Sequence, residues 1–345
     1  MERPAAGPRI GVLSIGRVRL ALVAAVIVFS GPAGALTAAF TRPDAVRPPP
    51  RVFAFFSHAG GQERADLARV GRKISVLAPN WYTLDLRTGG VQGPSGNAPV
   101  LDEARRLGLA VWPVVNARAQ GVVTLHDQAL TRRLARAIVR IGTARGYGGV
   151  TVDIEGVAAS GRAAFSALVA RVARRLHRHG RKLAVYAPGV DGVGSGAAYD
   201  WSSLAHSANL LLVSTYASGV VSTTPGPASS GTSFAAAAGR AAAVSTSSVA
   251  PTLEAVGYSW PAAGGRARIL SATAAARRRA RCRAKATTRN DAASFACHGR
   301  RVYYPTARGL RAEARDARSR GIRWIGLYSL GREPAGFWRG FDTTS

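Results

Sequence analysis

Short apolar runs alternate with longer amphipathic stretches along most of the chain after residue 50. The runs are rich in aliphatic and aromatic side chains, as in buried strands, and between them apolar residues recur at three- and four-residue spacing, as on one face of a helix. Helices are expected between the strands, for example over 127–144 and 161–179. Eight segments fit the strand pattern: RVFAFFSH (51–58), KISVLAPNWY (73–82), LAVWPVVNA (109–117), GGVTVDIEGV (148–157), KLAVYAPGV (182–190), NLLLVSTYA (209–217), SVAPTLEAVGY (248–258) and IRWIGLYSL (322–330).

Eight repeats over about 290 residues predict a (β/α)8 TIM barrel of the α/β class, in which the chemistry lies where strands end and helices begin. A doubly wound open sheet is the alternative architecture. The stretch between the last two strands, 261–321, is too long for one helix. We therefore expect a small α+β insertion over about 261–306 and a last barrel helix near 307–320. The barrel would span 51–338 and leave a short tail at 339–345.

The N-terminal 40 residues have a different pattern. A basic start precedes the apolar run LALVAAVIVF (20–29), and small residues follow it. This order is typical of a secretory signal; if it is not cleaved, residues 20–40 would form a weak membrane anchor, interrupted by Gly31 and Pro32. The Pro-rich segment 41–50 would then be an extended linker. We expect the rest of the chain to be exported, either secreted or held at the cell envelope.

The charge is strongly positive. The formal net charge is +29, from 47 Lys and Arg against 18 Asp and Glu, which points to a polyanionic partner such as an anionic cell wall, acidic lipid or nucleic acid. Biased composition explains the charge equally well, because the arginines are spread over many segments. The run ARRRARCRAK (276–285) has almost no interleaved aromatic residues, so a solvated basic surface is favoured over a nucleic-acid site.

We expect neither a metal nor a nucleotide cofactor. The glycines of GVGSG (192–196) lack the spacing of a dinucleotide-binding loop, and His177 and His179 belong to a basic helix end, where solvated surface residues are expected. The only cysteines, Cys282 and Cys297, lie close together in one polar segment. In an exported protein such a pair is expected to form a local disulfide.

Two carboxylates interrupt the fourth predicted strand, where a buried strand should be apolar. Because alternate residues of a strand share a face, Thr151, Asp153 and Glu155 point one way and the apolar residues between them point the other. The apolar set can pack on helices, so the acids face the barrel interior near the strand's C-terminal end. Burying neighbouring carboxylates is costly and raises the pKa of at least one, which favours catalysis. A buried salt-bridge cluster with arginines is the alternative.

At this strand the chain resembles a known family. GGVTVDIEGV is similar to the strand-four motif of family 18 glycoside hydrolases, Asp-x-x-Asp-x-Asp-x-Glu, in the degenerate form of bacterial peptidoglycan hydrolases related to spore-germination enzymes. The resemblance covers 51–338 in the correct order. It also rests on LAPNWYTLD (77–85), LGLAVWPVVNA (107–117), YDWSSLAHSANLLLVSTYA (199–217), VGYSW (256–260) and GIRWIGLYSLGREPAGFW (321–338).

The resemblance implies retaining hydrolysis of β-1,4-linked N-acetylated amino-sugar polymers, with the substrate's own 2-acetamido group as nucleophile. Glu155 would be the general acid and later the general base. Asp153 would orient the acetamido group and stabilise the charge that develops on it. Tyr216 matches the strand-six tyrosine that hydrogen-bonds the same group.

The chain also departs from the family pattern. Thr151 and Gly148 stand where the family has its middle and first aspartates, and Ala217 replaces the usual Asp after Tyr216. A non-catalytic carbohydrate-binding barrel is therefore the alternative function. Residues near the strand ends are expected to contact the glycan: Trp81, Tyr82, Asn116, Thr151, Tyr258, Trp260 and Tyr328, the last at the position of the family's strand-eight tryptophan.

Overall fold

A computed structural model describes residues 48–57, 61–93, 98–123, 125–144, 146–189, 196–215, 224–227, 229, 231–289 and 292–341. They belong to the unit Val46–Ser345. The predicted signal or anchor and most of the predicted linker lie outside the described residues. Within the described ranges, no helix has both the length and the apolar character needed to cross a membrane.

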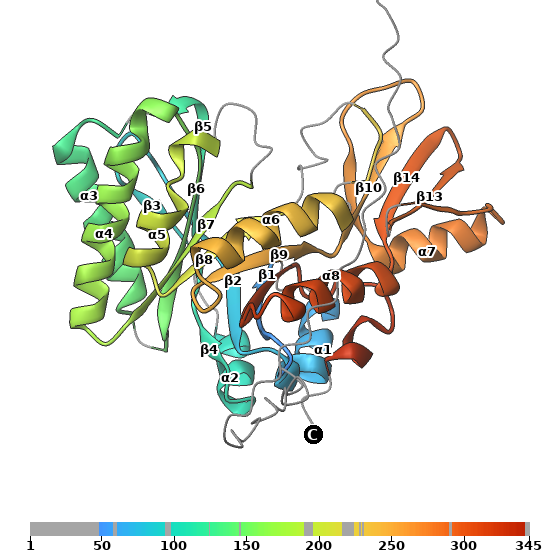
Figure 1. Ribbon diagram of the computed structural model, residues 1–345, viewed down its shortest axis with the longest axis horizontal. Helices are drawn as coiled ribbons and strands as arrows, with labels where there is room; N and C mark the ends of the chain where they lie inside the picture. The colour runs from blue at the N-terminus through green and yellow to red at the C-terminus, as the bar shows by residue number, and fades with distance from the viewer. Residues whose placement is uncertain are drawn as a thin grey trace, which may run out of the picture. The chain divides into compact units, whose positions relative to one another are not determined.

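Eight parallel strands close into a barrel (Figure 1). Neighbouring strands of the ring pair in parallel, and β1 pairs with both β2 and β15, which closes it. Each strand overlaps a segment predicted from the sequence. The predicted (β/α)8 barrel is therefore confirmed, and the alternative, a doubly wound open sheet, is not the fold that forms. The strands are β1 (Arg51–Phe56), β2 (Val76–Leu84), β5 (Val114–Val123), β6 (Gly149–Val157), β7 (Lys182–Ala187), β8 (Leu210–Ser214), β9 (Val249–Glu254) and β15 (Trp324–Tyr328).

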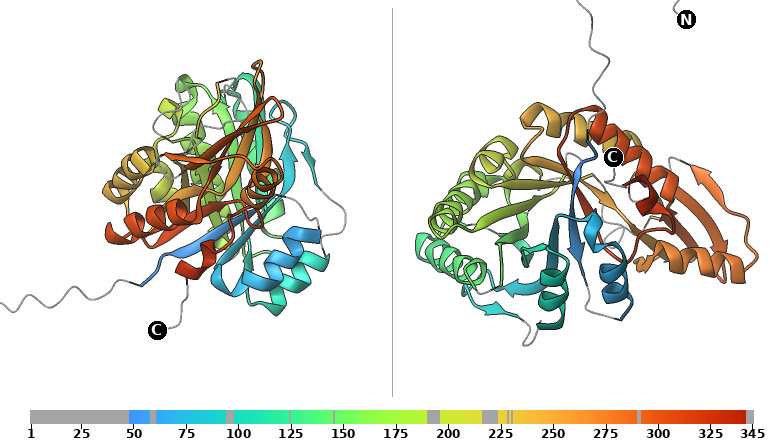
Figure 2. Two further views of the ribbon diagram at one scale, coloured as in Figure 1. Left: turned by 90° about the vertical axis from the view of Figure 1, so that its right-hand side faces the viewer. Right: turned by 90° about the horizontal axis from the view of Figure 1, so that it is seen from below.

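The helices lie around the outside of the strands (Figure 2). They are α1 (Gly61–Val70), α2 (Ala98–Arg106), α3 (Gln128–Gly142), α4 (Arg162–Arg178), α5 (Trp201–Ser207), α6 (Gly231–Val244) and α8 (Ala307–Ser319). Two short strands, β3 (Val91–Gln92) and β4 (Ala110–Val111), pair with β2. The chain also forms the 3-10 turns η1 (Gly71–Lys73), η2 (Ala159–Gly161), η3 (Gly196–Ala198) and η4 (Phe337–Gly340). The helices predicted over 127–144, 161–179 and near 307–320 are confirmed by α3, α4 and α8.

The strands bury both faces, which explains their nearly continuous apolar runs. Outward-facing residues such as Val152 and Ile154 pack with the helices in one large cluster. Inward-facing residues form a second cluster with an aromatic centre: the ring of Phe55 meets those of Phe53 and Tyr186 edge to face, at 5.5 and 5.8 Å between centroids. The barrel interior is thus a packed core beneath the strand ends.

The closing segment belongs to the same fold. Phe341 is 3% exposed and packs on the rings of Phe337 and Trp338, all three within the outer cluster. The predicted tail at 339–345 therefore includes one residue, Phe341, that packs into the fold.

The insertion between the last two barrel strands has its own sheet. It contains β10 (Val256–Pro261), β11 (Arg268–Ser271), α7 (Ala272–Arg281), β12 (Thr287–Arg289), β13 (Ala292–Cys297) and β14 (Arg300–Pro305). The strands are antiparallel in the order β11-β10-β14-β13-β12, and α7 packs on them through alanines. The insertion begins before the expected boundary at 261, because β10 starts two residues after β9 ends.

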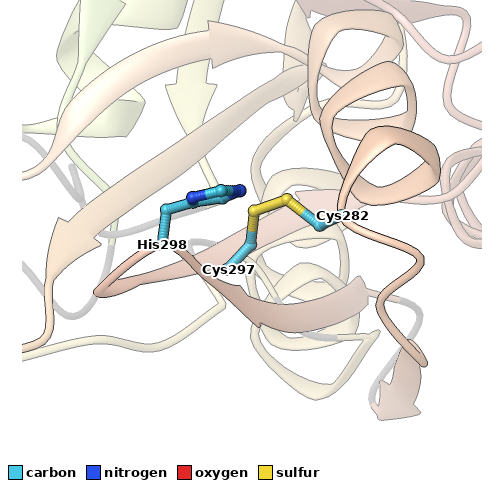
Figure 3. Close-up of side chains that lie close together, drawn as sticks. All are labelled: Cys282, Cys297 and His298. Carbon is cyan, nitrogen blue, oxygen red and sulfur yellow. A yellow bond between two sulfur atoms is a disulfide. The ribbon is translucent and has the colours of Figure 1, made fainter.

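A disulfide joins Cys282, just after α7, to Cys297 at the end of β13 (Figure 3), with 6.1 Å between their Cα atoms. His298 lies beside the two sulfurs, so the three side chains have the spacing of a metal site. Sulfur binds metal ions as the thiolate. The disulfide removes both thiolates, so the two cysteines form a covalent link between α7 and the sheet of the insertion.

Asp200 gives a testable contribution to stability. Its carboxylate caps α5 by accepting a hydrogen bond from the Ser203 amide at 3.1 Å and pairs with Arg162 of α4 at 2.9 Å. The Ser203 amide, followed by Arg162, lowers the pKa of Asp200 below 3.8. The stabilisation is therefore present above that pH and lost as the pH falls through the lowered value.

We expect Asp200→Ala to lower the free energy of unfolding by about 1 kcal/mol at pH 7, the usual value of an N-cap. Denaturation in urea at pH 7 and at pH 3 would measure this loss, which should shrink at the acid pH. Asp200→Asn is the control, since asparagine keeps the cap and loses the ion pair. Equal losses in both variants would mean that the ion pair, and not the cap, stabilises the helix.

Candidate active site

The two faces of the acidic strand β6 differ in burial and in polarity. Its outward residues are fully buried, whereas Asp153 and Glu155 on the inner face are half-buried near the C-terminal end. Thr151 lies deeper on the same face, and its hydroxyl donates to the carbonyl of Trp112 at 3.0 Å. Both acids therefore sit where chemistry occurs in such barrels, above a buried hydroxyl that is already engaged.

A row of polar side chains crosses three neighbouring strands at this level. Asn116 of β5 is the register partner of Asp153, and its amide nitrogen donates to the Oδ1 of Asn80 on β2. Asn116 was predicted as a contact, but Asn80 was missed. Its signal was present in the sequence, because Asn80 lies two residues after inward-facing Ala78 and so shares its face.

Tyr328 lies at the end of β15, between the barrel interior and the insertion. Its ring meets that of Phe55 edge to face at 5.9 Å and also packs against the aromatic cluster of the insertion. Burial raises the pKa of its phenol; the charge of Arg332 and a hydrogen bond with Ser57 oppose this, and the charges of Glu254 and Asp153 add smaller increases. Tyr328 is thus a neutral hydroxyl at the end of β15, and its contact with the glycan stays a prediction.

Trp81 and Tyr82 lie away from this row. Asn80 pairs with Val114 and Tyr82 with Val115, so β2 carries one extra residue, a bulge that turns Tyr82 outward. Both rings pack on the outer cluster and on Tyr147, whose hydroxyl lies 2.9 Å from that of Tyr82. The described contacts of both rings are with the outer cluster and with Tyr147, whereas the predicted contact with the glycan would need them on the inner face beside the acids.

Tyr258 and Trp260 are on β10, inside the insertion. They are 2% and 1% exposed, and their rings pack on each other at 5.8 Å, with Tyr303 covering Trp260. Rings this deeply buried have no face left for a sugar, so the structure argues against the predicted contact of Tyr258 and Trp260 with the glycan. The sequence placed them at the end of the seventh barrel strand, but the chain has already entered the second sheet.

Two of the residues named from the resemblance fall outside the described part of the chain. They are Tyr216 and Ala217, which follow β8. Thr215, the last described residue of this segment, is buried, and its hydroxyl donates to the Thr252 carbonyl at 2.6 Å. The role of Tyr216 stays a prediction.

A tyrosine that the sequence analysis missed braces the acidic strand from outside. Tyr199 is 1% exposed; its hydroxyl donates to the carbonyl of Ile154 at 2.7 Å and accepts from the amide of Val157 at 3.5 Å. The two hydrogen bonds hold the backbone on either side of Glu155 and Gly156. Gly156 has a φ of +78°, a left-handed conformation that glycine adopts without strain. Desolvation raises the pKa of Tyr199, so it remains a hydrogen-bond donor.

Tyr199→Phe should therefore reduce activity through the position of Glu155. Removing the hydroxyl leaves the buried Ile154 carbonyl without its partner, at a cost of about 1–3 kcal/mol in the free energy of unfolding. We expect kcat to fall by roughly tenfold with KM little changed, since one such bond corresponds to about tenfold in rate. Steady-state kinetics beside a thermal melt would measure both. If Tyr199→Phe lowered the stability but left kcat unchanged, Tyr199 would have a structural role only.

The arrangement suits acid–base chemistry on a polar, uncharged ligand. Glu155 can give or take a proton, Asp153 can stabilise positive charge beside it, and the amides of Asn116 and Asn80 offer hydrogen bonds to hydroxyl or amide groups. The described residues that form the site come from β2, β5, β6 and β15, which the closed barrel brings to one end.

Comparisons by sequence find no matching family profile and no matching curated protein. Solved structures do share the fold. A chitinase from Chromobacterium violaceum superposes with a TM-score of 0.75 at 21% identity, over 85% of this chain and 98% of that one. The spore cortex-lytic enzyme SleL from Bacillus cereus gives 0.76 at 16%, over 87% and 75%. A mutant class V chitinase from Nicotiana tobaccum, in complex with NAG4, gives 0.67 at 12%, over 86% and 97%.

Proposed function

We propose that the chain is a glycosidase that cleaves β-1,4 bonds in N-acetylated amino-sugar polymers of the peptidoglycan or chitin type. One observation carries the proposal: Asp153 and Glu155 share the inner face of β6 at the C-terminal end of the barrel. The fold adds support, because proteins named as chitinases and as a spore cortex-lytic enzyme have the same architecture.

In this proposal the catalysis is retaining and substrate-assisted. Glu155 donates its proton to the glycosidic oxygen as the acetamido oxygen of the same sugar attacks the anomeric carbon and displaces the leaving sugar. Asp153 holds the acetamido N–H and stabilises the positive charge on the ring that forms. The Glu155 carboxylate then takes a proton from water, whose oxygen adds to the anomeric carbon and reopens the ring.

Neighbouring polar groups would hold the sugar during these steps. The Asn116 amide lies beside Asp153, and Tyr328, at the same end of the barrel on the strand across from β6, offers a neutral hydroxyl. Tyr216 is proposed as a further donor to the acetamido group. No step calls for a metal ion or cofactor.

The test is to incubate the full-length chain with purified peptidoglycan and, separately, with chitin oligomers. New reducing ends would be labelled by borohydride reduction and identified by mass spectrometry. We expect release from at least one polymer, and the labelled sugar names the bond that is cut. Absence of new ends from both, by a chain shown to be folded, would contradict the proposal.

A non-catalytic carbohydrate-binding barrel is the second candidate, and Thr151 favours it. In the family that the sequence resembles, an aspartate at the position of Thr151 usually shares a proton with the aspartate at the position of Asp153. Here the Thr151 hydroxyl donates to the Trp112 carbonyl instead. Such a protein would bind chitin oligomers in calorimetry and release no reducing sugar. Binding with turnover excludes this candidate.

We further propose that the chain acts outside the cytoplasm, attached to an anionic wall by its charge. The signal-like segment 1–40 and the net charge of +29 support this. N-terminal sequencing of the protein from medium and envelope fractions would establish export and cleavage. Release from isolated walls by moderate salt would support the electrostatic attachment.

A further inference from the structure

A groove lies between the outer layer of the barrel and the insertion. Its volume is about 500 Å³, which is within the range of ligand-binding clefts. Its walls come from α1 and η1 of the barrel, from the start of α7 in the insertion and from the closing segment 331–339. The described residues that line it do not include Asp153 or Glu155, so the groove is separate from the acidic site on β6.

Four basic residues and two acids line this groove, and the protein itself binds both acids. Asp66 accepts a hydrogen bond from the Arg69 guanidinium at 2.8 Å. Glu333 is 7% exposed, and its two oxygens accept from the indole of Trp338 at 2.6 Å and from the Gly331 amide at 2.7 Å. Both carboxylates are held by protein donors, so the basic side chains determine what the groove attracts.

Arg277 of α7 and Arg339 of the closing segment supply the available donors. Both side chains are exposed, and neither guanidinium group has a hydrogen bond or an ion pair with another described residue. Arg69 and Lys73 add charge beside them, although the Lys73 ammonium already donates to the Trp338 carbonyl at 3.1 Å. Guanidinium groups bind the oxygens of phosphate and carboxylate in pairs, so these two arginines suit an anionic ligand.

The positive charge continues through the insertion. Residues 261–306 contain 11 Lys and Arg against one acid, Asp291. The described ion pairs belong to the barrel, and none of the described Lys or Arg side chains of the insertion takes part in one. Burial lowers the pKa of Arg300, and the charges of Arg268 and Arg278 lower it further. The cations of the insertion therefore repel one another.

Two of these arginines share one face of α7. Arg277 and Arg281 are four residues apart, so their exposed side chains are neighbours. Like charges at this spacing destabilise a helix, and an anion bound between them would remove the repulsion. Because Arg277 also lines the groove, one basic surface extends from the groove along α7. Such a surface fits a linear polymer with repeated negative charges better than one small anion.

Aromatic rings offer little to a ligand in the groove. Trp338 is 5% exposed, and its ring packs on those of Phe337 and Phe341. Among the described residues that line the groove it is the only aromatic one, so no open ring face is available for base stacking. The polymer is therefore recognised through its charged groups and not through nucleobases.

We propose that the groove and the exposed face of α7 bind a linear polymer that carries repeated phosphate groups, with Arg277 and Arg339 as the principal contacts. The parallel N–H donors of each guanidinium group match two oxygens of a phosphate group. This inference deepens the proposed attachment to an anionic wall, on which it rests, because it names the place and the chemistry of the contact.

Long-chain inorganic polyphosphate is the probe, titrated into the full-length chain in a calorimeter between about 50 and 200 mM NaCl. The double variant Arg277→Gln with Arg339→Gln should raise the Kd by about tenfold or more, because two charge-assisted contacts are lost. The slope of log Kd against log [NaCl] should fall by about one to two. A thermal melt verifies that the variant is folded, as expected for two exposed side chains.

The matched control is Arg136→Gln with Arg140→Gln. These are two exposed arginines of α3 that do not line the groove, so the net charge changes equally. The control should keep the Kd within about twofold of the wild type, since exposed charges away from the contact are screened by salt. Both double variants should release reducing ends from soluble chitin oligomers at the wild-type rate. Failure of the glycosidase proposal and failure of this one therefore give different results.

Three results would overturn the proposal. Equal Kd values for the two double variants would mean that the net charge, and not the groove, holds the polymer. Binding of inorganic phosphate as tight as that of polyphosphate would make the groove a site for the free ion. Tighter binding of a single-stranded oligonucleotide or of polyglutamate, at equal charge and salt, would make the partner a nucleic acid or a polycarboxylate.

Discussion

Replacing Glu155 by glutamine is expected to lower the release of reducing sugars by about 10²–10⁴-fold, the usual contribution of a positioned general acid–base group. Glutamine has nearly the same size and keeps the half-buried place on the inner face of β6. It can neither protonate the glycosidic oxygen nor take the proton of the attacking water. Both halves of the proposed reaction should therefore slow, while binding of the oligomer is retained.

The matched control is Glu103→Gln on α2, the same chemical change in an ion pair with Arg106 on the outer layer. It should keep full activity. Initial rates on chitin oligomers, with calorimetry for binding, would separate turnover from affinity. If Glu155→Gln kept more than a tenth of the wild-type rate, another group would have to be the acid. If neither the wild type nor Glu155→Gln released sugar but both bound the oligomer, the protein would be a non-catalytic carbohydrate-binding barrel.

The sequence predicts the barrel well because its signals are local. A strand buried on both faces has an apolar run that stops at polar or glycine-rich turns, and each of the eight runs overlaps an observed strand. In β6 the alternation of two acids with Val152 and Ile154 already assigns the faces, because the period of a strand is two. The inward position of Asp153 and Glu155 follows from that pattern alone.

Local irregularities changed the positions of other predicted residues. A single bulge between Asn80 and Tyr82 turns the tyrosine from the inner face to the outer one, and nothing in the alternation reveals it. Tyr258 and Trp260 were misplaced for a similar reason. The chain leaves β9 and begins β10 with one residue between them, so an apparently continuous strand belongs to two sheets.

Other features arise only from contacts between distant segments. A Cβ atom at Gly148 would lie 3.1 Å from the indole nitrogen of Trp112, so any larger residue at this position would need a small shift of that ring. Tyr199 reaches the Ile154 carbonyl across 45 residues of sequence. Glu254 and Glu313 share a cavity although they belong to different layers of the fold. No periodicity in the sequence encodes such pairs.

Residues 148 and 151 are not acids, although the family that the sequence resembles has aspartates at the matching positions, and this makes Asp153 the sharper test of mechanism. Trp112 lies close to Gly148, and its carbonyl accepts a hydrogen bond from the Thr151 hydroxyl, so the described inner face of β6 carries no acid below Asp153. The negative charge of Asp153 then has to stabilise the ring-closed intermediate without a second acid beneath it on the strand.

Asp153→Asn should therefore lower kcat by about 10²–10³-fold, the cost of removing one preorganised electrostatic group. KM should change little, because the amide can still hydrogen-bond the sugar. Asp102→Asn, the same change in an exposed pair with Arg105 at 2.7 Å, is the control and should leave kcat unaltered. A thermal melt would verify that both variants fold. A raised KM at constant kcat would mean that Asp153 only binds the glycan, and charge stabilisation of the intermediate would then have to come from elsewhere.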